Sequence, residues 1–255
     1  MKPKISILGC GWLGLPLASK LASDGYIVSG STTSISKLDK LKSEDVTPFL
    51  IDISNLDDNI SGFLNSEILI IAITSKKIND YKKLLQLIER SQIKKVIFVS
   101  STSVYENSNQ IITEESSTKN TQLLHIEKLF IENKKIKTTI IRFGGLFGYN
   151  RIPGNFIPLN KKMENPEGFV NLIHRDDCIR IIEQLILKNV WDTTLNACAD
   201  SHPKRRDFYT KENIKLGNKN TLFNENSMNE YKIISSEKLK SILDYNFKYS
   251  NLMLY

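Results

Sequence analysis

The segment Gly9–Gly14, with the sequence GCGWLG, constrains the fold of this chain more than any other feature. It directly follows Ile5–Leu8, a short apolar run of the kind that forms a buried strand. Apolar residues then recur at helical spacing as far as Ser23. A G-x-G-x-x-G sequence between a buried strand and an amphipathic helix is the fingerprint of a Rossmann-type loop. The segment therefore predicts that the chain begins with a β-α-β unit that binds a dinucleotide.

Each glycine of this loop has a separate expected role. Gly9 permits a tight turn, Gly11 lets the backbone approach a pyrophosphate, and Gly14 lets helix and strand pack closely. The helix N-terminus supplies unpaired N–H groups and the positive end of its dipole. A glycine-rich turn that binds no ligand is the alternative. The residues expected to contact the dinucleotide are Gly9, Cys10, Gly11, Trp12, Leu13 and Gly14.

Runs rich in Ile, Val and Leu alternate with helical patterns through the first two thirds of the chain. Apolar runs without polar alternation are typical of strands covered on both faces, so the alternation predicts an α/β fold with a Rossmann-type doubly wound parallel sheet. The expected strands are 5–8, a run that starts at 26–28, 48–51, 67–72, 95–99, 138–142, 168–173 and 194–196. The expected helices are 13–23, 35–42, 80–91, 122–132, 176–188, 207–216 and 236–243.

This pattern also predicts the domain organisation of the chain. We expect residues 1–150 to form the NAD(P)-binding Rossmann domain, completed by about 176–200. Residues 151–175 and 201–255 are expected to form a small C-terminal lobe that binds the substrate.

The end of the second strand should indicate which dinucleotide is bound. An NAD site usually places Asp or Glu there to hold the ribose hydroxyls, but no acidic residue precedes Asp39 in this region. The hydroxyls of Ser31, Thr32 and Thr33, with the ammonium of Lys37, suit a 2′-phosphate. They favour NADP over NAD. The alternative is that these residues form an ordinary polar loop with no role in cofactor binding.

Two further residues are cofactor candidates because they follow or end expected strands. Asp52, just after the third strand, is expected either to contact the adenine or to cap the following turn. Ala72 ends the fourth strand.

The composition argues against several classes of function. The formal net charge of +7 comes from basic residues spread along the whole chain without interleaved aromatics, so we expect no nucleic-acid partner. No apolar run reaches the roughly 18–20 residues that span a bilayer, and no secretory apolar region follows the N-terminus. We therefore expect a cytoplasmic protein without a membrane partner. Cys10, Cys178 and Cys198 lack metal-binding spacing, so we expect no metal site.

A second motif, Ser100–Tyr105 (SSTSVY), follows the strand at 95–99, at the edge where such sheets bind ligands. Together with Gly11–Gly14 and the segments 142–148, 168–177 and 202–209, it resembles the extended short-chain dehydrogenase/reductase superfamily. The resemblance is closer to the atypical YeeZ-like branch, which is described as NAD(P)-binding or epimerase/dehydratase-like. These segments span nearly the whole chain in the family's order.

By that resemblance, Ser101 occupies the catalytic serine position, where its hydroxyl would hydrogen-bond a substrate carbonyl or alcohol. The superfamily also uses a Tyr-x-x-x-Lys pair, but none of the nine tyrosines has a lysine four residues later. Aligning Glu127 with the family's acidic residue puts Lys119 and Leu123 at the two positions, and the alternative alignment on Lys128 puts Leu124 at the tyrosine. A positioned acid/base contributes about 10²–10⁴-fold to a rate, so its loss matters.

Lys119 and His125 are the nearby side chains that could donate a proton, and both are also explained as ordinary surface residues. The expected substrate residues are Thr102, Tyr105, Arg142, His174 and Arg205. Arg142 could equally pair with a surface acid, and Arg205 could equally be a solvated helix start. Asp176, beside His174, is expected to cap a helix.

These observations favour an NAD(P)-dependent oxidoreductase or epimerase with an atypical active site. It would act on the carbonyl or carbinol of a small, sugar-related molecule, and a homodimer is one expected assembly. The alternative is a non-catalytic NAD(P)-binding sensor or scaffold.

Overall fold

The computed structural model describes residues 2–56, 60–156, 161–217 and 221–255. The chain forms two compact units. The first comprises Met1–Ser100, Asn120–Ile141 and Ile182–Thr194, and the second comprises Ser101–Lys119, Arg142–Ile181 and Leu195–Tyr255.

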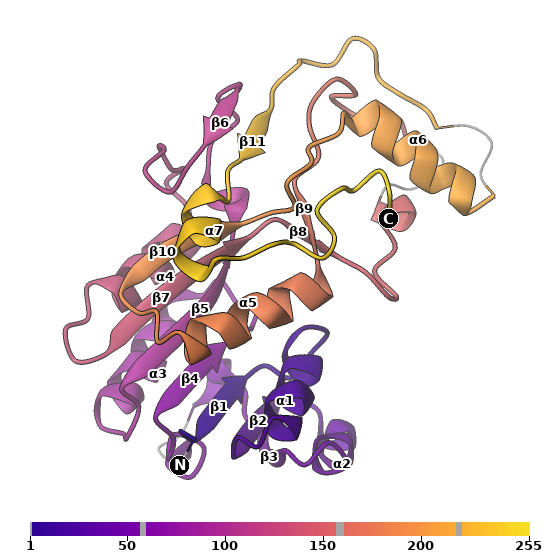
Figure 1. Ribbon diagram of the computed structural model, residues 1–255. Coiled ribbons are helices and arrows are strands. Elements are labelled where there is room, and N and C mark those ends of the chain that lie inside the picture. Colours follow the sequence, from indigo (N-terminus) through magenta and orange to yellow (C-terminus); the bar gives the residue numbers. More distant parts are fainter. Residues whose placement is uncertain (1, 57–59, 157–160, 218–220) are drawn as a thin grey trace. The chain divides into compact units, whose positions relative to one another are not determined.

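A seven-stranded parallel sheet with the order β10-β7-β5-β4-β1-β2-β3 is the main element of the fold (Figure 1), which confirms the predicted Rossmann-type class. β1 pairs in parallel with β2 on one side and with β4 on the other, so the strand order reverses at β1. Ligands bind outside the carboxyl ends of the strands at such a reversal. The strands are β1 (Ile5–Leu8), β2 (Val28–Thr32), β3 (Thr47–Leu50), β4 (Ile68–Ile71), β5 (Lys95–Ser101), β7 (Lys137–Phe143) and β10 (Thr193–Ala197).

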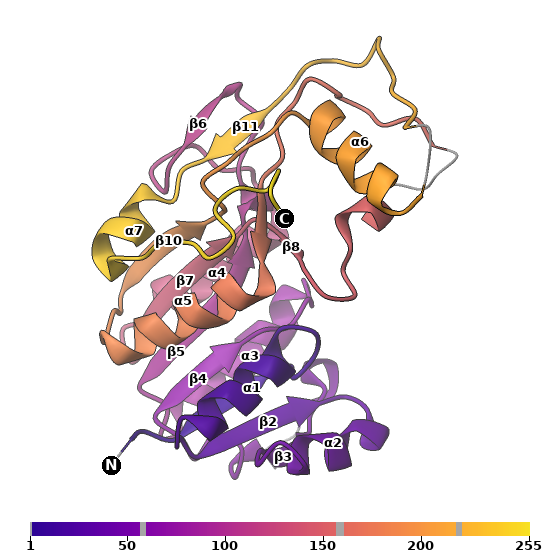
Figure 2. The same ribbon diagram turned by 45° about the vertical axis from the view of Figure 1, so that its right-hand side comes forward.

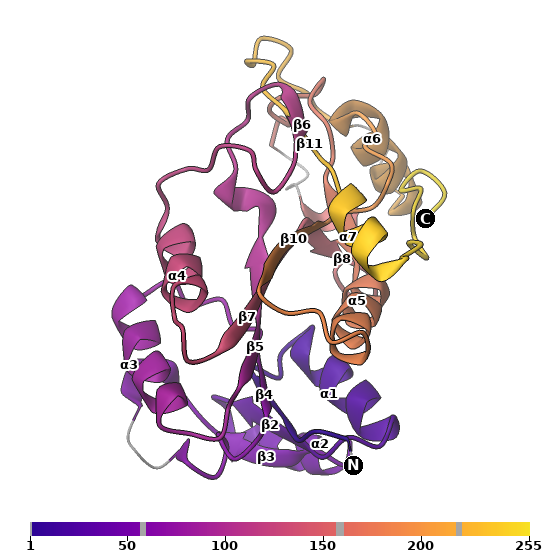
Figure 3. The same ribbon diagram turned by 60° about the vertical axis from the view of Figure 1, so that its left-hand side comes forward.

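Helices cover both faces of this sheet. Figure 3 shows α3 and α4 on one face of the sheet and α1 on the other, as a doubly wound fold requires. The helices are α1 (Gly14–Ser23), α2 (Leu38–Lys42), α3 (Ile78–Glu89), α4 (Gln122–Ile131), α5 (Arg175–Leu187), α6 (Arg205–Lys215) and α7 (Glu237–Leu243). Within the described ranges, none of them has the length and hydropathy needed to cross a bilayer.

Burial on both faces explains why the central strands of the sheet are rich in Ile and Leu. All four residues of β1 and of β4 are buried. Under α3 and α4, the rings of Tyr81, Phe98 and Phe130 lie with centroids 5.3–6.3 Å apart. This cluster anchors the helices on the face opposite α1 (Figure 3).

The second unit contains two small parallel sheets whose partners are far apart in sequence. β6 (Gln110–Ile112) pairs with β11 (Lys232–Ile234), and β8 (Gly145–Phe147) pairs with β9 (Leu172–His174). Figure 2 shows β6 and β11 side by side. Asn171 links the two sheets: its amide donates to the Lys232 carbonyl at 2.8 Å and its oxygen accepts from Ile234 N–H at 2.9 Å.

The structure corrects several predicted boundaries. The strand expected to start at Tyr26 begins at Val28 and continues to Thr32, because it pairs with β1 and β3 over that length. The strand expected at 168–173 begins only at Leu172 and ends at His174, since only these three residues pair with β8. β6, β8 and β11 were not predicted, because three-residue strands that pair with distant segments carry little local signal.

Gly14 is a position where packing requires glycine, because a Cβ there would lie 2.1 Å from the Gly9 carbonyl oxygen. We expect Gly14→Ala to lower the free energy of unfolding by about 1–3 kcal/mol, as overpacking does. Gly11→Ala is the matched control, since its Cβ meets nothing within 4 Å. Urea denaturation of both variants measures the difference, and equal stabilities would contradict the packing role of Gly14.

Candidate functional site

The loop between β1 and α1 is tight at its ends and open in the middle. Gly9 has a φ of 99°, and a Cβ there would lie 2.4 Å from Ile73 Cγ2 and 2.8 Å from the Ala72 carbonyl oxygen. Gly14 is closed in the same way by Gly9. Gly11 is exposed and has no heavy atom near its Cβ position, so a ligand can approach its Cα, while its N–H donates to the Gly9 carbonyl at 2.8 Å.

The N-terminus of α1 adds the electrostatics that an anion requires. Its N-cap residue is Leu13, which offers no side-chain acceptor, and its first turn holds no acidic residue. Its leading amides and the positive end of its dipole therefore lack a capping carboxylate or hydroxyl from α1 itself. An open glycine backbone before such a helix fits the diphosphate of a dinucleotide.

Ser31 holds this loop in place from β2. Its hydroxyl oxygen accepts from Gly9 N–H at 3.0 Å, and its carbonyl accepts from Cys10 N–H at 2.7 Å. Ser31 and Cys10 are both buried, and burial raises the pKa of the Cys10 thiol to about 12. Ser31 and Cys10 therefore shape the loop from within, through contacts that a sequence motif does not reveal.

The predicted 2′-phosphate residues divide into buried and exposed groups. The buried Thr32 hydroxyl accepts from Ser34 N–H at 3.2 Å. Thr33 and Lys37 are exposed, and the hydroxyls of Ser34 and Ser36 lie 2.8 Å apart beside them. This short segment presents hydroxyls and one ammonium, without a carboxylate.

Asp52 and Ala72 lie where the strand ends place them. Asp52 Oδ1 accepts from Ser54 N–H at 2.9 Å and from the Ser54 hydroxyl at 2.8 Å, which lowers the pKa of the carboxyl. Asp52 thus caps the 3₁₀ turn η2 (Ile53–Asn55), and contact with an adenine stays a prediction. Ala72 follows β4, donates to the Leu8 carbonyl at 2.9 Å and borders Gly9.

The SSTSVY motif turns sharply after β5. The Ser100 hydroxyl donates to Glu127 on α4, and both side chains are buried. Ser101 is only partly buried, and its hydroxyl oxygen accepts from Ser103 N–H at 3.1 Å at the start of η4 (Thr102–Val104). This bond uses a lone pair of the Ser101 oxygen and not its O–H group, whereas Thr102 is buried.

Tyr105 and Arg142, both predicted substrate residues, belong to one buried network in the second unit. Arg142 Nη1 donates to the Tyr105 phenol oxygen at 2.6 Å, and that phenol donates to Asn196 Oδ1 at 2.8 Å. Arg142 is only 5% exposed. Burial raises the pKa of Tyr105 against the opposing effect of Arg142, so the phenol stays protonated. Asn196 was not identified from its sequence pattern, because its partner Tyr105 is 91 residues away.

His174 is buried at the start of α5 and caps this helix. Its Nδ1 accepts from Asp176 N–H at 3.1 Å, and its ring centroid lies 3.8 Å from that of Tyr249. Asp176, which was expected to be the cap, lies inside the first turn. Its carboxylate accepts from the Tyr149 hydroxyl at 2.8 Å and from Lys248 Nζ at 2.9 Å.

The remaining candidates lie elsewhere in the second unit or are exposed. Arg205 Nε donates to the Glu164 carbonyl at 3.3 Å, and its guanidinium lies 5.5 Å from the centre of the Tyr209 ring. His125 is exposed on α4. Lys119 Nζ lies 3.9 Å from Glu106 Oε2. Among the described residues, no group of three His, Cys, Asp or Glu side chains could hold a metal ion.

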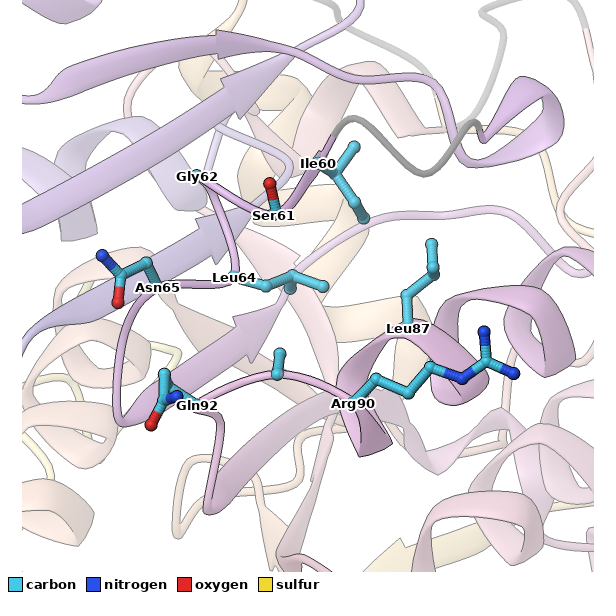
Figure 4. Close-up of a pocket in the computed structure, with 9 residues that line it drawn as sticks. Ile60, Ser61, Gly62, Leu64, Asn65, Leu87, Arg90 and Gln92 are labelled. Atoms are coloured by element: carbon cyan, nitrogen blue, oxygen red, sulfur yellow. The ribbon is translucent and has the colours of Figure 1, made fainter.

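A cavity of ≈ 530 Å³ in the first unit is separate from these residues (Figure 4). It is lined by segments that precede the amino ends of β4 and β5, namely Ile60–Asn65 and Leu87–Gln92. The glycine loop and the SSTSVY motif follow the carboxyl ends of their strands. The cavity therefore lies at the opposite edge of the sheet from the predicted cofactor residues.

Comparison with known proteins identifies a family and structural relatives. A family model described as NAD(P)H-binding matches residues 9–185, which is more than half of the chain. Protein YeeZ from Escherichia coli strain K12 is 26% identical over 264 residues, covering 96% of each chain.

Two solved structures are similar in fold. A conserved, functionally unknown protein from Silicibacter pomeroyi has a TM-score of 0.83 and 16% identity, with 99% of this chain and 96% of that chain covered. The UDP-glucuronic acid 4-epimerase from Bacillus cereus, in complex with UDP-glucuronic acid and NAD, has a TM-score of 0.78 and 18% identity, with 98% and 95% covered. At such identities the likeness shows the fold alone.

The burial of His174 generates a prediction about pH. Burial lowers the pKa of His174 below its unfolded value, and that of His202 as well, so the unfolded chain binds more protons. Stability is then fully present above the unfolded pKa of about 6.5 and is lost as the pH falls through the lower folded values. We expect the free energy of unfolding to decrease from pH 7.5 to 5.5, and His174→Gln to reduce that decrease. His202→Gln should remove a separate part of the same pH-dependent decrease. If the free energy of unfolding of His174→Gln falls between pH 7.5 and 5.5 as much as that of the unmodified protein, the lowered pKa of His174 is contradicted.

Proposed function

The chain belongs to the NAD(P)H-binding family, with full-length similarity to YeeZ, and on this premise we propose that it is an NAD(P)-dependent oxidoreductase or epimerase. The observation that carries the proposal is the loop Gly9–Gly14, whose exposed Gly11 lets a ligand approach closely just before the N-terminus of α1, where no side chain caps the helix. Residues of the loop would hold the diphosphate. The bound nicotinamide would supply hydride exchange with a carbonyl or carbinol carbon.

We propose NADP as the preferred cofactor. The exposed Thr33 and Lys37, with the Ser34 and Ser36 hydroxyls, offer donors to a 2′-phosphate at the end of β2. No acidic residue in this segment would hold the ribose hydroxyls of NAD or repel that phosphate. Ser31 and Thr32 stabilise the adjoining backbone, since the Ser31 hydroxyl accepts from Gly9 N–H and the Thr32 hydroxyl accepts from Ser34 N–H.

Calorimetric titration tests this preference. We expect NADPH to bind at least about tenfold more tightly than NADH, because one charge-assisted hydrogen bond contributes about 1.5–3 kcal/mol. Lys37→Gln should remove most of this difference. Lys40→Gln, which changes another exposed lysine nearby on α2, should leave it intact. Equal affinities for NADPH and NADH in the unmodified protein would contradict the proposal.

Ser101 is the group that we propose to polarise the substrate oxygen. Its oxygen is fixed by Ser103 N–H, so its hydroxyl proton can be directed at a carbonyl. The relative from Bacillus cereus was solved with UDP-glucuronic acid, which makes a sugar-related, anionic substrate the first class to examine. Thr102, Tyr105, Arg142, His174 and Arg205 stay substrate candidates, and the predicted lobe of 151–175 and 201–255 stays the proposed substrate domain.

The missing Tyr-x-x-x-Lys pair favours a second candidate, an NAD(P)-binding sensor or scaffold that does not turn over. Ser101, retained with an available hydroxyl, favours the enzyme. For either candidate we propose a cytoplasmic homodimer that binds small molecules rather than nucleic acid or membranes.

Turnover separates the two candidates. Protein loaded with NADPH is incubated with panels of carbonyl compounds and nucleotide sugars, and the absorbance of the reduced nicotinamide is followed. We expect Ser101→Ala to lower kcat/KM by about 10²-fold, as removal of one preorganised donor does, with unchanged NADPH affinity. Ser103→Ala keeps the backbone N–H and should retain activity. If no carbonyl compound oxidises NADPH faster than the Ser101→Ala background, and protein loaded with oxidised cofactor epimerises no nucleotide sugar, the sensor replaces the enzyme.

A further inference from the structure

The proposed hydride exchange needs a proton donor, and two lysines, Lys119 and Lys232, lie against the turn that follows β5. This turn is Ser101–Tyr105, and it begins with the serine proposed to hold the substrate oxygen. Lys119 is held against the turn, since its backbone N–H donates to the Val104 carbonyl at 2.7 Å. Lys232 is held against the turn as well, since its Nζ donates to the Tyr105 carbonyl at 2.8 Å.

Lys232 reaches this turn from a distant part of the chain. It is the first residue of β11, where it pairs with Gln110 of β6 (Figure 2). Asn171 fixes its backbone by donating to the Lys232 carbonyl at 2.8 Å. The amine of Lys232 is thus half-buried and directed at the turn by two independent anchors, one on its backbone and one on its side chain.

The surroundings of Lys232 give its amine the properties of an acid/base. Burial, followed by the positive charge of Lys119, lowers the pKa of Lys232 to about 8, while Glu106 acts in the opposite direction. Tyr105 is the other titratable group of the turn, and its phenol is directed instead at Arg142 and Asn196. A desolvated lysine beside a second cation is a known way to obtain an amine that titrates near neutral pH.

We propose that Lys232 takes the place of the missing tyrosine as the proton donor, with Lys119 as its positively charged neighbour. The inference rests on the proposed function. In the direction of reduction, an N–H bond of the Lys232 ammonium would break and an O–H bond would form on the substrate oxygen, and NAD(P)H, when bound, would supply the hydride to the carbonyl carbon and be oxidised. The neutral amine then regains a proton from water. In the direction of oxidation, the neutral amine accepts the alcohol proton as hydride leaves for the oxidised cofactor.

Competitive acetylation followed by mass spectrometry measures the titration of Lys232 without any turnover. We expect the labelling midpoint of Lys232 near pH 8, well below the value of about 10.4 for an ordinary exposed lysine. Lys119→Gln should raise this midpoint by about half a unit or more, Glu106→Gln should lower it, and Lys119→Arg should leave it unchanged. A midpoint in the ordinary lysine range, or one that does not respond to Lys119→Gln, overturns the inference.

Kinetics then distinguish a proton donor from a structural lysine. Lys232→Arg keeps the charge and a donor for the Tyr105 carbonyl, but an arginine does not titrate near neutral pH. We expect Lys232→Arg and Lys232→Met to lose about 10²–10⁴-fold in kcat/KM with unchanged NADPH affinity. The limb of the pH–rate profile near pH 8 should move with Lys119→Gln in the same direction as the labelling midpoint.

The outcomes separate this inference from the proposed function. If NADPH does not bind, or if no substrate turns over, the proposed function fails and the role of Lys232 fails with it. If NADPH binds and turnover survives in Lys232→Arg and Lys232→Met, only the role of Lys232 fails.

Discussion

The backbone contact between Gly9 and Gly14 is the constraint on which the cofactor side of the structure depends. A Cβ at Gly14 would lie 2.1 Å from the Gly9 carbonyl oxygen, and one at Gly9 would lie 2.4 Å from Ile73 Cγ2. Because both positions are glycine, α1 can start directly above the carboxyl end of β1. The hydroxyl of Ser31 then fixes Gly9 N–H from the neighbouring strand. Together these contacts leave Gly11 exposed beside the N-terminus of α1, where an anion is favoured.

The second unit is organised by buried polar groups that hydrogen-bond to one another. Arg142, Tyr105 and Asn196 form a hydrogen-bonded chain. Asp177 on α5 accepts from the Tyr245 hydroxyl at 2.7 Å and from the backbone of Lys248 and Tyr249. Buried polar groups are costly unless paired, so such networks fix the relative positions of the segments that contribute to them.

The fold could be predicted from the sequence where local pattern and burial coincide. β1 and β4 are covered on both faces, so apart from Ser6 their residues are all apolar. The glycine spacing of the loop after β1 is also required by few other structures. The site was predicted less completely. Sequence spacing places Ser101 and Arg142 near strand ends, but it does not show that Arg142 bonds to Tyr105 or that His174 caps α5. Asn196 and Lys232 were missed because their partners are 91 and 127 residues away, and a single side chain with a distant partner leaves no periodic signal.

The central claim is that the Gly9–Gly14 loop holds a dinucleotide diphosphate, and nuclear magnetic resonance of glycine amides tests it most directly. Labelling with [¹⁵N]glycine gives one signal for each of the twelve glycines, which report on separate parts of the molecule. Titration with NADP should shift the signals of Gly9, Gly11 and Gly14 to saturation and leave Gly62, at the cavity on the opposite sheet edge, unchanged. Shifts confined to Gly62, or no saturating shift of Gly9, Gly11 and Gly14 at millimolar NADP or NAD, would contradict the claim.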